Sequence, residues 1–172
     1  MRDRIKEISI SILFLSISII LQSTIINMIS INGIKPDFSL IVLVFISYRK
    51  GCMVGQVSGF ISGLLEDFIS LTPIGFSSLI KAIIGFLYGL IQGSFIIDRI
   101  FIPMLFILIA TILKGIFSSL IATIFSLDYI VINIFHYNTL IRIVYNAVLA
   151  PLIFFLLNIL RIFKISEKEK LS

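Results

Sequence analysis

Long apolar runs, separated by short clusters of charged and turn-forming residues, make up most of this chain. Ile, Leu and Phe recur on every face of these runs, and apolar residues do not alternate with polar ones. Helices that are apolar all round lie in a protein core or in a membrane, whereas the strands of a membrane barrel alternate. The pattern therefore predicts an all-α integral membrane protein and argues against a transmembrane β-barrel.

The charged and turn-forming clusters divide the chain into six expected membrane spans. A helix needs about 20 residues to cross about 30 Å of hydrocarbon. Six spans thus leave only short loops, and the whole chain, 1–172, is expected to form one transmembrane domain. A charged lead, 1–7, precedes the spans, and a charged tail, 164–172, follows them. The expected spans are 8–31, 38–48, 51–71, 75–97, 100–127 and 137–163.

The second span is too short to cross a membrane unaided. Even from Pro36, a favoured first-turn residue, to Lys50 it offers about 22 Å of helix. We expect it to thin the bilayer locally or to be shielded by neighbouring helices. The alternative is a bundle of five spans in which this second segment is re-entrant.

The distribution of Lys and Arg predicts the orientation of the spans. Ten of these residues lie on one side of the expected topology, against Lys35 alone in the opposite loops. Because cytoplasmic loops carry the excess of Lys and Arg, both termini and Arg49-Lys50 are expected in the cytoplasm, with the protein in the inner (cytoplasmic) membrane. The ten are Arg2, Arg4, Lys6, Arg49, Lys50, Arg99, Arg161, Lys164, Lys168 and Lys170.

The composition agrees with burial in lipid. Of the 172 residues, 59% are hydrophobic and 13% are charged, and the mean hydropathy is +1.17, whereas a soluble domain is about 25% charged. The net charge of +5 and the pI near 9.5 are explained by the Lys and Arg residues on the expected cytoplasmic side, and they do not indicate a nucleic-acid partner. A single cysteine, Cys52, and a single histidine, His136, argue against an internal disulfide and a metal site, and no cofactor is expected.

Glycines recur at every fourth position along two neighbouring spans. Small residues let helix backbones approach closely in lipid, where no hydrophobic effect drives association. We expect these two glycine stripes to pack the third span against the fourth. The alternative is that one stripe docks the transmembrane helix of a partner protein. The stripes are Gly51, Gly55, Gly59 and Gly63, and then Gly85, Gly89 and Gly93.

Five charged residues fall within the apolar runs, at a similar depth in the outer half of the membrane. Because a charge in hydrocarbon is costly, such residues usually find partners. We expect a charge cluster that fixes the register of the helices, with Asp67 paired to Lys81. A transport pathway or ligand site is one alternative, and simple snorkelling to the interface is another. The five are Glu66, Asp67, Lys81, Lys114 and Arg142.

Nothing in the sequence has the form of an active site. The Ser and Thr residues of the spans have no His or Asp at a spacing that would serve nucleophilic catalysis. The glycines are four apart within helices and do not form a phosphate-binding loop. We therefore expect a protein that is not an enzyme.

One stretch, about residues 36–93, resembles a known family. Pro36-Asp37-Phe38, an apolar span, a basic pair and Gly51 are followed by Gly59-Phe60, Gly63-Leu64, Asp67, Pro73-Ile74-Gly75-Phe76 and Gly85-Phe86-Leu87. This order and spacing is similar to that of the rod shape-determining protein MreD family, with Glu66 directly before the family's usual Asp. Which of the two acids carries a role is open. The matching motif positions are Pro36, Asp37, Gly59, Gly63, Asp67, Pro73 and Gly75.

The resemblance implies a non-enzymatic membrane scaffold of the rod (elongation) complex, which directs lateral peptidoglycan synthesis and maintains cell shape. It implies a bitopic partner, MreC, and indirect contact with the actin-like MreB and the elongation transpeptidase and glycosyltransferase. Membrane lipid is the other expected partner. The implied fold is similar to the six-helix S component of energy-coupling-factor transporters.

That similarity supplies the rival function, a substrate-binding S component of a vitamin transporter. Such components dock through an Ala-x-x-x-Ala pattern in the first span, but residues 8–31 contain no alanine. A ligand pocket would also need polar and aromatic residues that converge near the outer face, and the chain has no Trp. The scaffold is therefore the favoured function.

Overall fold

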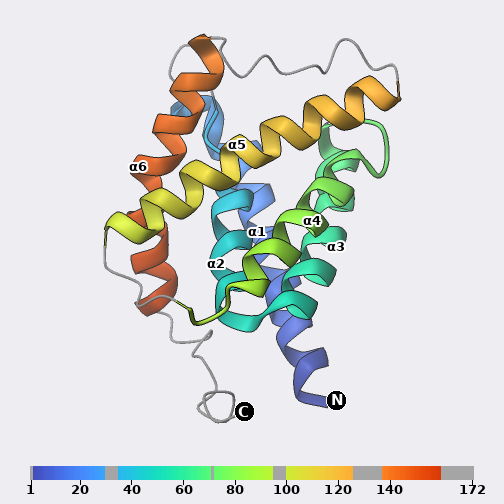
Figure 1. Ribbon diagram of the computed structural model, residues 1–172, viewed down its shortest axis with the longest axis vertical. Coiled ribbons are helices and arrows are strands. Elements are labelled where there is room, and N and C mark those ends of the chain that lie inside the picture. Colours follow the sequence, from blue (N-terminus) through green and yellow to red (C-terminus); the bar gives the residue numbers. More distant parts are fainter. Residues whose placement is uncertain (1, 30–34, 71, 95–99, 126–136, 160–172) are drawn as a thin grey trace.

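The computed structural model describes residues 2–29, 35–70, 72–94, 100–125 and 137–159. Within these ranges the chain forms six helices and no strand, which confirms the expected all-α bundle (Figure 1). The helices are α1 (Arg2–Ile29), α2 (Phe38–Lys50), α3 (Cys52–Ser70), α4 (Phe76–Leu90), α5 (Phe101–Ile124) and α6 (Tyr137–Ile159).

Local chemistry explains where the helices begin. α1 includes the charged lead, because residues 2–7 contain neither Gly nor Pro and are rich in good helix formers. Asp37 caps α2, and its side chain accepts a hydrogen bond from the Leu40 amide at 3.0 Å. α4 follows Gly75, whose φ of +102° lies in the left-handed region that favours glycine. The tail 164–172 lies outside the described residues, as do the far ends of several expected spans. α4, however, ends at Leu90, short of the expected 97, and a turn follows it.

Four of the described helices are long and apolar enough to cross a membrane, namely α1 (over Arg4–Thr24), α3, α5 and α6. The other two are shorter. α4 has 15 residues and α2 has 13, which correspond to about 22 Å and about 20 Å of helix.

The short helix α2 occupies the centre of the bundle. It packs against all five of the other described helices, and every residue from Ser39 to Tyr48 is buried. Protein thus covers the apolar surface of α2 on all sides, which is the shielded arrangement considered for this segment. The helix also runs from one end of the bundle to the other, because its last residue, Lys50, forms an ion pair of 2.6 Å with Glu7 near the start of α1.

The glycine stripes lie between α3 and α4, which pack together more extensively than any other pair of described helices. A Cβ atom added at Gly59 would lie 2.6 Å from the carbonyl oxygen of Lys81. Gly63 faces the backbone of Ser78, and Gly85 faces the backbone of Gly55. The two helix backbones are therefore in direct contact, at a distance that only glycine permits. Gly93 differs, because it follows α4, has a φ of +67° and has no neighbouring atom within 4 Å of an added Cβ.

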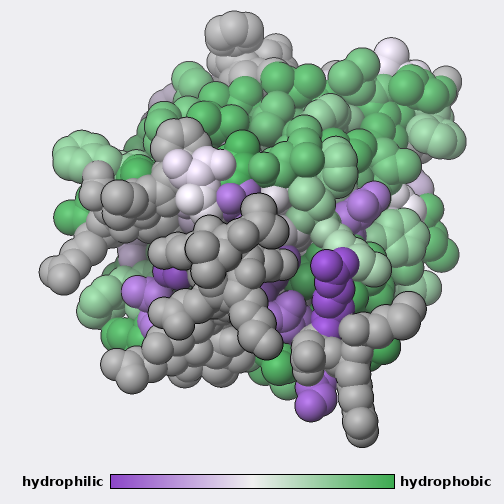
Figure 2. Space-filling view, turned by 60° about the horizontal axis from the view of Figure 1, so that its bottom comes forward, coloured by the Kyte–Doolittle hydropathy of each residue, from purple (hydrophilic) through white to green (hydrophobic). Residues whose placement is uncertain are grey.

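Polar contacts place the start of α1 and the ends of α2, α4 and α6 at one end of the bundle. Besides the Lys50–Glu7 pair, Arg49 donates to the Asn158 side chain at 3.0 Å, and Gln92 donates to the Arg49 carbonyl at 3.3 Å. We call this the basic end. Figure 2, in which the bottom of Figure 1 comes forward, shows hydrophilic side chains gathered there between largely hydrophobic flanks.

Candidate functional site

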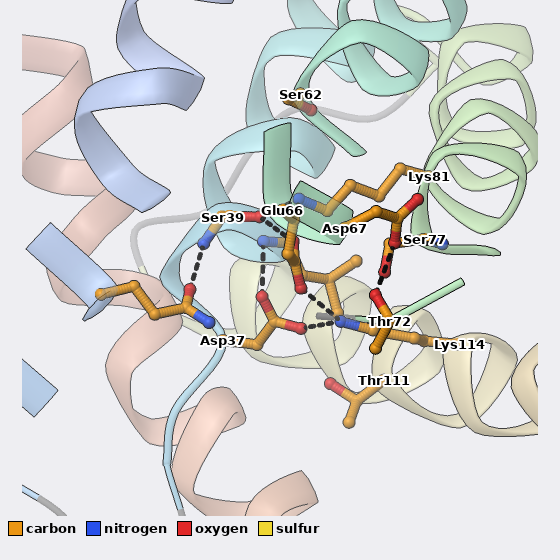
Figure 3. A network of polar contacts seen from close by, with 12 residues as sticks. Asp37, Ser39, Ser62, Glu66, Asp67, Thr72, Ser77, Lys81, Thr111 and Lys114 are labelled. Atoms are coloured by element: carbon orange, nitrogen blue, oxygen red, sulfur yellow. Dashed lines mark hydrogen bonds and ion pairs between the residues drawn. The ribbon is translucent and has the colours of Figure 1, made fainter. Parts of the chain in front are cut away.

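The charged residues inside the bundle meet at the opposite end, around the start of α2 (Figure 3). Lys81 of α4 is fully buried, and its ammonium group forms an ion pair with the Oε2 atom of Glu66 on α3. The same ammonium group donates a hydrogen bond to the Ser39 hydroxyl of α2, and Ser39 donates to Glu66 Oε2 at 3.3 Å. α2, α3 and α4 are thereby joined at one point.

A second ion pair joins α5 to this point. The ammonium group of Lys114 pairs with the Oδ2 atom of Asp37, the residue that caps α2. It also lies 3.7 Å from Glu66 Oε1. The side chain of Lys114 is 22% exposed and that of Asp37 is 9% exposed. Two carboxylates and two ammonium groups therefore alternate, and their formal charges cancel.

Uncharged side chains extend the network to the remaining two helices. The Asp37 amide donates to the Asn146 side chain of α6 at 2.8 Å, and Asn146 donates to Thr111 of α5 at 3.2 Å. The Ser39 amide donates to the Gln22 side chain of α1 at 3.2 Å. Each of the six described helices thus contributes at least one side chain. We call this set the polar network: Gln22, Asp37, Ser39, Glu66, Lys81, Thr111, Lys114 and Asn146.

Asp67 lies beside the polar network but has a different structural role. Its carboxylate accepts hydrogen bonds from the Thr72 hydroxyl at 2.9 Å, the Gly75 amide at 3.0 Å and the Ser77 amide at 2.9 Å. Carboxylates stabilise helix N-termini because the first amides of a helix have no partner within it. Asp67 therefore caps α4. The expected pair of Asp67 with Lys81 is wrong, since Lys81 pairs with Glu66.

The expected charge cluster is thus divided. Glu66, Lys81 and Lys114 meet, Asp67 faces the start of α4, and Arg142 is exposed on α6. The structure adds two residues to the cluster expected from the sequence, namely Asp37, which pairs with Lys114, and Asn146, which accepts from the Asp37 amide. A polar residue within an apolar run was the available signal for Asn146. For Asp37, the signal was an acid directly before a helix start.

The geometry of the polar network is that of a structural junction. Removing one partner of a buried ion pair typically costs about 3–5 kcal/mol, because the other charge is left without compensation. The four alternating charges therefore favour one register of α2, α3, α4 and α5 over any arrangement that separates them. Ionisable side chains within membrane-spanning helices are costly, and they usually pair with one another as these do.

The motif positions also gather around the α3–α4 hairpin. Gly59 and Gly63 contact α4, and the Gly75 amide donates to Asp67. The Pro73 carbonyl accepts from the Phe76 amide at 3.1 Å, which closes the turn into α4. Pro36 is buried beside the cap of α2. The motif residues thus build the turn and the helix contact that carry Glu66 and Lys81.

Comparison with known proteins agrees with the resemblance seen in the motif. The family model of the rod shape-determining protein MreD matches residues 2–160. No curated protein and no solved structure matches the chain. The match covers the bundle from α1 to the end of α6, and four of the described helices are suited to crossing a membrane. The chain therefore belongs to the rod shape-determining protein MreD family and is a multi-pass membrane protein with a role in rod shape determination.

Proposed function

We propose that this protein is a non-enzymatic scaffold of the rod (elongation) complex in the inner (cytoplasmic) membrane, where it supports cell-shape maintenance and lateral peptidoglycan synthesis. The observation that carries the proposal is the mutual pairing of the charges inside the bundle. Glu66 pairs with Lys81 and Lys114, and Lys114 also pairs with Asp37. Charges that are paired in this way hold helices together, which suits a protein whose task is to present a fixed surface.

The centre of α2 supports a scaffold over a transport pathway. Residues 40–46 follow the polar network toward the basic end, and all of them are apolar and buried. An ion or polar solute that passed along α2 would have to cross about 10 Å of tightly covered apolar helix. Intramembrane charges of transporters line such paths with further polar groups.

The proposed partner is the bitopic subunit MreC, with the actin-like MreB and the elongation transpeptidase and glycosyltransferase reached indirectly. The glycine stripes do not offer its transmembrane helix a surface while α3 and α4 are packed, because Gly59 and Gly85 face the opposing backbone. We therefore place the partner on the exposed apolar surface of the bundle. Apolar residues exposed on this surface include Leu13, Phe60, Phe86, Leu120 and Leu152.

The basic end is proposed to face the cytoplasm, together with both termini. Arg4, Lys6, Arg49 and Lys50 belong to this end, and the excess of Lys and Arg marks the cytoplasmic side of membrane proteins. Each such residue near an anionic leaflet contributes about 1 kcal/mol of attraction. Lipid headgroups are thus the proposed contact of this end.

Depletion in a rod-shaped cell tests the proposal. Depleted cells should lose control of their width or become round, and the tagged protein should co-purify with the bitopic shape-complex subunit. Wild-type protein expressed from a second locus is the control and should restore the width. If depleted cells kept a normal shape and the purified protein bound a vitamin tightly, the scaffold proposal would be wrong and the S-component function would be favoured.

Photo-cross-linking maps the partner surface. A photoreactive amino acid is placed at one exposed position on each lipid-facing helix and at the fully buried Leu43 as control. The proposal expects cross-links to the bitopic subunit from one face and none from Leu43. If no exposed position formed a cross-link to the subunit, direct binding along the membrane-facing surface would be contradicted. The exposed positions are Leu13, Phe60, Phe86, Leu120 and Leu152.

A further inference from the structure

Helix packing separates α5 and α6 from the rest of the bundle. In the described part of the chain, α6 packs against α5 and α2, while α5 packs against α6, α2 and α4. Neither α5 nor α6 packs against α1 or α3, whereas α3 packs against both α1 and α4, and all three of these helices pack against α2. Figure 1 shows α5 running obliquely across the bundle, from beside α6 toward the end where α3 and α4 meet. The α5–α6 pair is therefore attached through a limited set of contacts.

An apolar cleft lies on the boundary between this pair and α4. Its volume is about 310 Å³. One wall is the turn and first residues of α4, and the other is the end of α5. The lining residues are Pro73, Ile74, Gly75, Phe76, Leu79, Ile121 and Phe125. The two units are thus incompletely packed near the network end.

At the basic end, by contrast, the two units meet through an aromatic cluster. The Phe106 ring of α5 lies 5.2 Å from the Tyr48 ring and 5.6 Å from the Tyr88 ring, measured between centroids. The Tyr88 hydroxyl of α4 donates to the Phe106 carbonyl at 2.6 Å. Edge-to-face rings at these distances attract one another in addition to their burial. This contact attaches α5 to α4 at the basic end.

At the network end, the attachment of the pair is polar. Lys114 pairs with Asp37 and lies near Glu66, while Asn146 accepts from the Asp37 amide. Apolar surfaces of helices gain little from leaving lipid for one another. An apolar cleft can therefore open into the hydrocarbon at small cost, whereas separating Lys114 from its carboxylates leaves charges unpaired. The polar contacts are therefore what holds the two units together at this end.

We propose that the α5–α6 pair is a pivoting unit, with the aromatic cluster around Phe106 as its pivot and Lys114 as the latch that keeps the α4–α5 cleft from widening. Release of Lys114 from Asp37 and Glu66 lets the end of α5 swing away from the start of α4. The device has two arrangements because the latch is either paired or broken. It acts independently of the partner proposed above.

Distance measurements between spin labels test the latch in the full-length protein, reconstituted in phosphatidylcholine vesicles in a Cys52→Ser background. One label pair, at Leu79 and Ile124, spans the cleft, and both positions are exposed. A reference pair at Phe60 and Phe86 reports α3 against α4, and both of these positions are exposed as well. Lys114→Met should shift the cleft distance to longer values or add a longer component, and it should leave the reference distance unchanged.

Gln22→Leu is the matched control, because it removes a hydrogen bond of the same polar network that joins α1 to α2. It should leave both distances as they are in the wild type. Where Lys114→Met does not accumulate, Lys114→Gln and Asn146→Ala remove less of the latch and should broaden the cleft distance in the same direction. The proposal is overturned if every folded variant at these two positions keeps the wild-type cleft distance, or if Gln22→Leu changes it equally.

Discussion

The adjacent acids Glu66 and Asp67, at the end of α3, have different structural roles although they are only one residue apart. Glu66 and Asp67 differ by about 100° around the helix, at 3.6 residues per turn. Glu66 therefore faces α2 and the ammonium groups, while Asp67 faces the amides at the start of α4. The family's usual Asp is thus the cap of α4, and the preceding Glu is the counterion of Lys81.

A double-mutant cycle separates these roles. Glu66→Gln leaves the fully buried Lys81 ammonium group without its carboxylate, and the loss of one partner of a buried pair costs about 3–5 kcal/mol. The double variant Glu66→Gln/Lys81→Met should regain part of that loss. The measurement is the free energy of unfolding in detergent micelles, determined for each single and double variant.

Asp67→Asn combined with Lys81→Met is the matched comparison. Residues without direct contact lose stability additively, so this second cycle should show little coupling. Strong coupling of Lys81 to Asp67, with none to Glu66, would contradict the arrangement described here.

At the scale of helices, the α3–α4 hairpin depends on the absence of side chains at its contact. Gly59→Leu should force the helices apart, and overpacking of this kind costs about 1–3 kcal/mol or more. Gly59→Ala should be milder than Leu, but it should still destabilise the hairpin, since its Cβ would lie 2.6 Å from the Lys81 carbonyl oxygen. Thermal stability and accumulation in the membrane are the measurements.

Gly93→Asn provides the control for that series. No atom lies within 4 Å of a Cβ at Gly93, and Asn tolerates the positive φ found there. This variant should resemble the wild type. If Gly59→Leu were as stable as Gly93→Asn, close backbone packing would not be what holds α3 against α4.

Much of this element-level organisation could be predicted from the sequence. The apolar runs and the charged clusters between them predicted six helices, and the four-residue spacing of glycine indicated the α3–α4 contact. The shortness of residues 38–48 left local thinning of the bilayer, shielding by neighbouring helices and a re-entrant segment as alternatives, and the structure shows the shielded arrangement. In each case the information is local to one or two neighbouring segments.

The polar network was less predictable, because it depends on segments that are distant in sequence. Asp37 and Asn146 are 109 positions apart, and Asp37 and Lys114 are 77 apart. Hydropathy places such residues at a depth in the membrane but does not say which helices are neighbours. The mistaken pairing of Asp67 with Lys81 came from choosing the wrong one of two adjacent acids, a choice that only the rotation of α3 decides.

For the molecule as a whole, orientation in the membrane is a separate prediction. We expect both termini and the Arg49-Lys50 pair inside, with Ile34 and Asp128 outside; the last two lie beyond the described residues. Single cysteines at these positions, in a Cys52→Ser background, are treated with a membrane-impermeant thiol reagent in intact cells. Labelling should be confined to positions 34 and 128. Labelling of a terminal cysteine would show that the orientation is the opposite of the one predicted.

The claim that the intramembrane charges serve structure, and not ligand binding or transport, is central to the proposed function. The most direct measurement is the width of depleted cells that express Glu66→Gln/Lys81→Met at the wild-type level. In this variant Lys114 keeps Asp37 as its partner, and an uncharged replacement of a buried pair can be neutral for stability. We predict rods of normal width. Round or widened cells, despite normal accumulation of the variant, would show that the charges themselves act in function and would contradict the account.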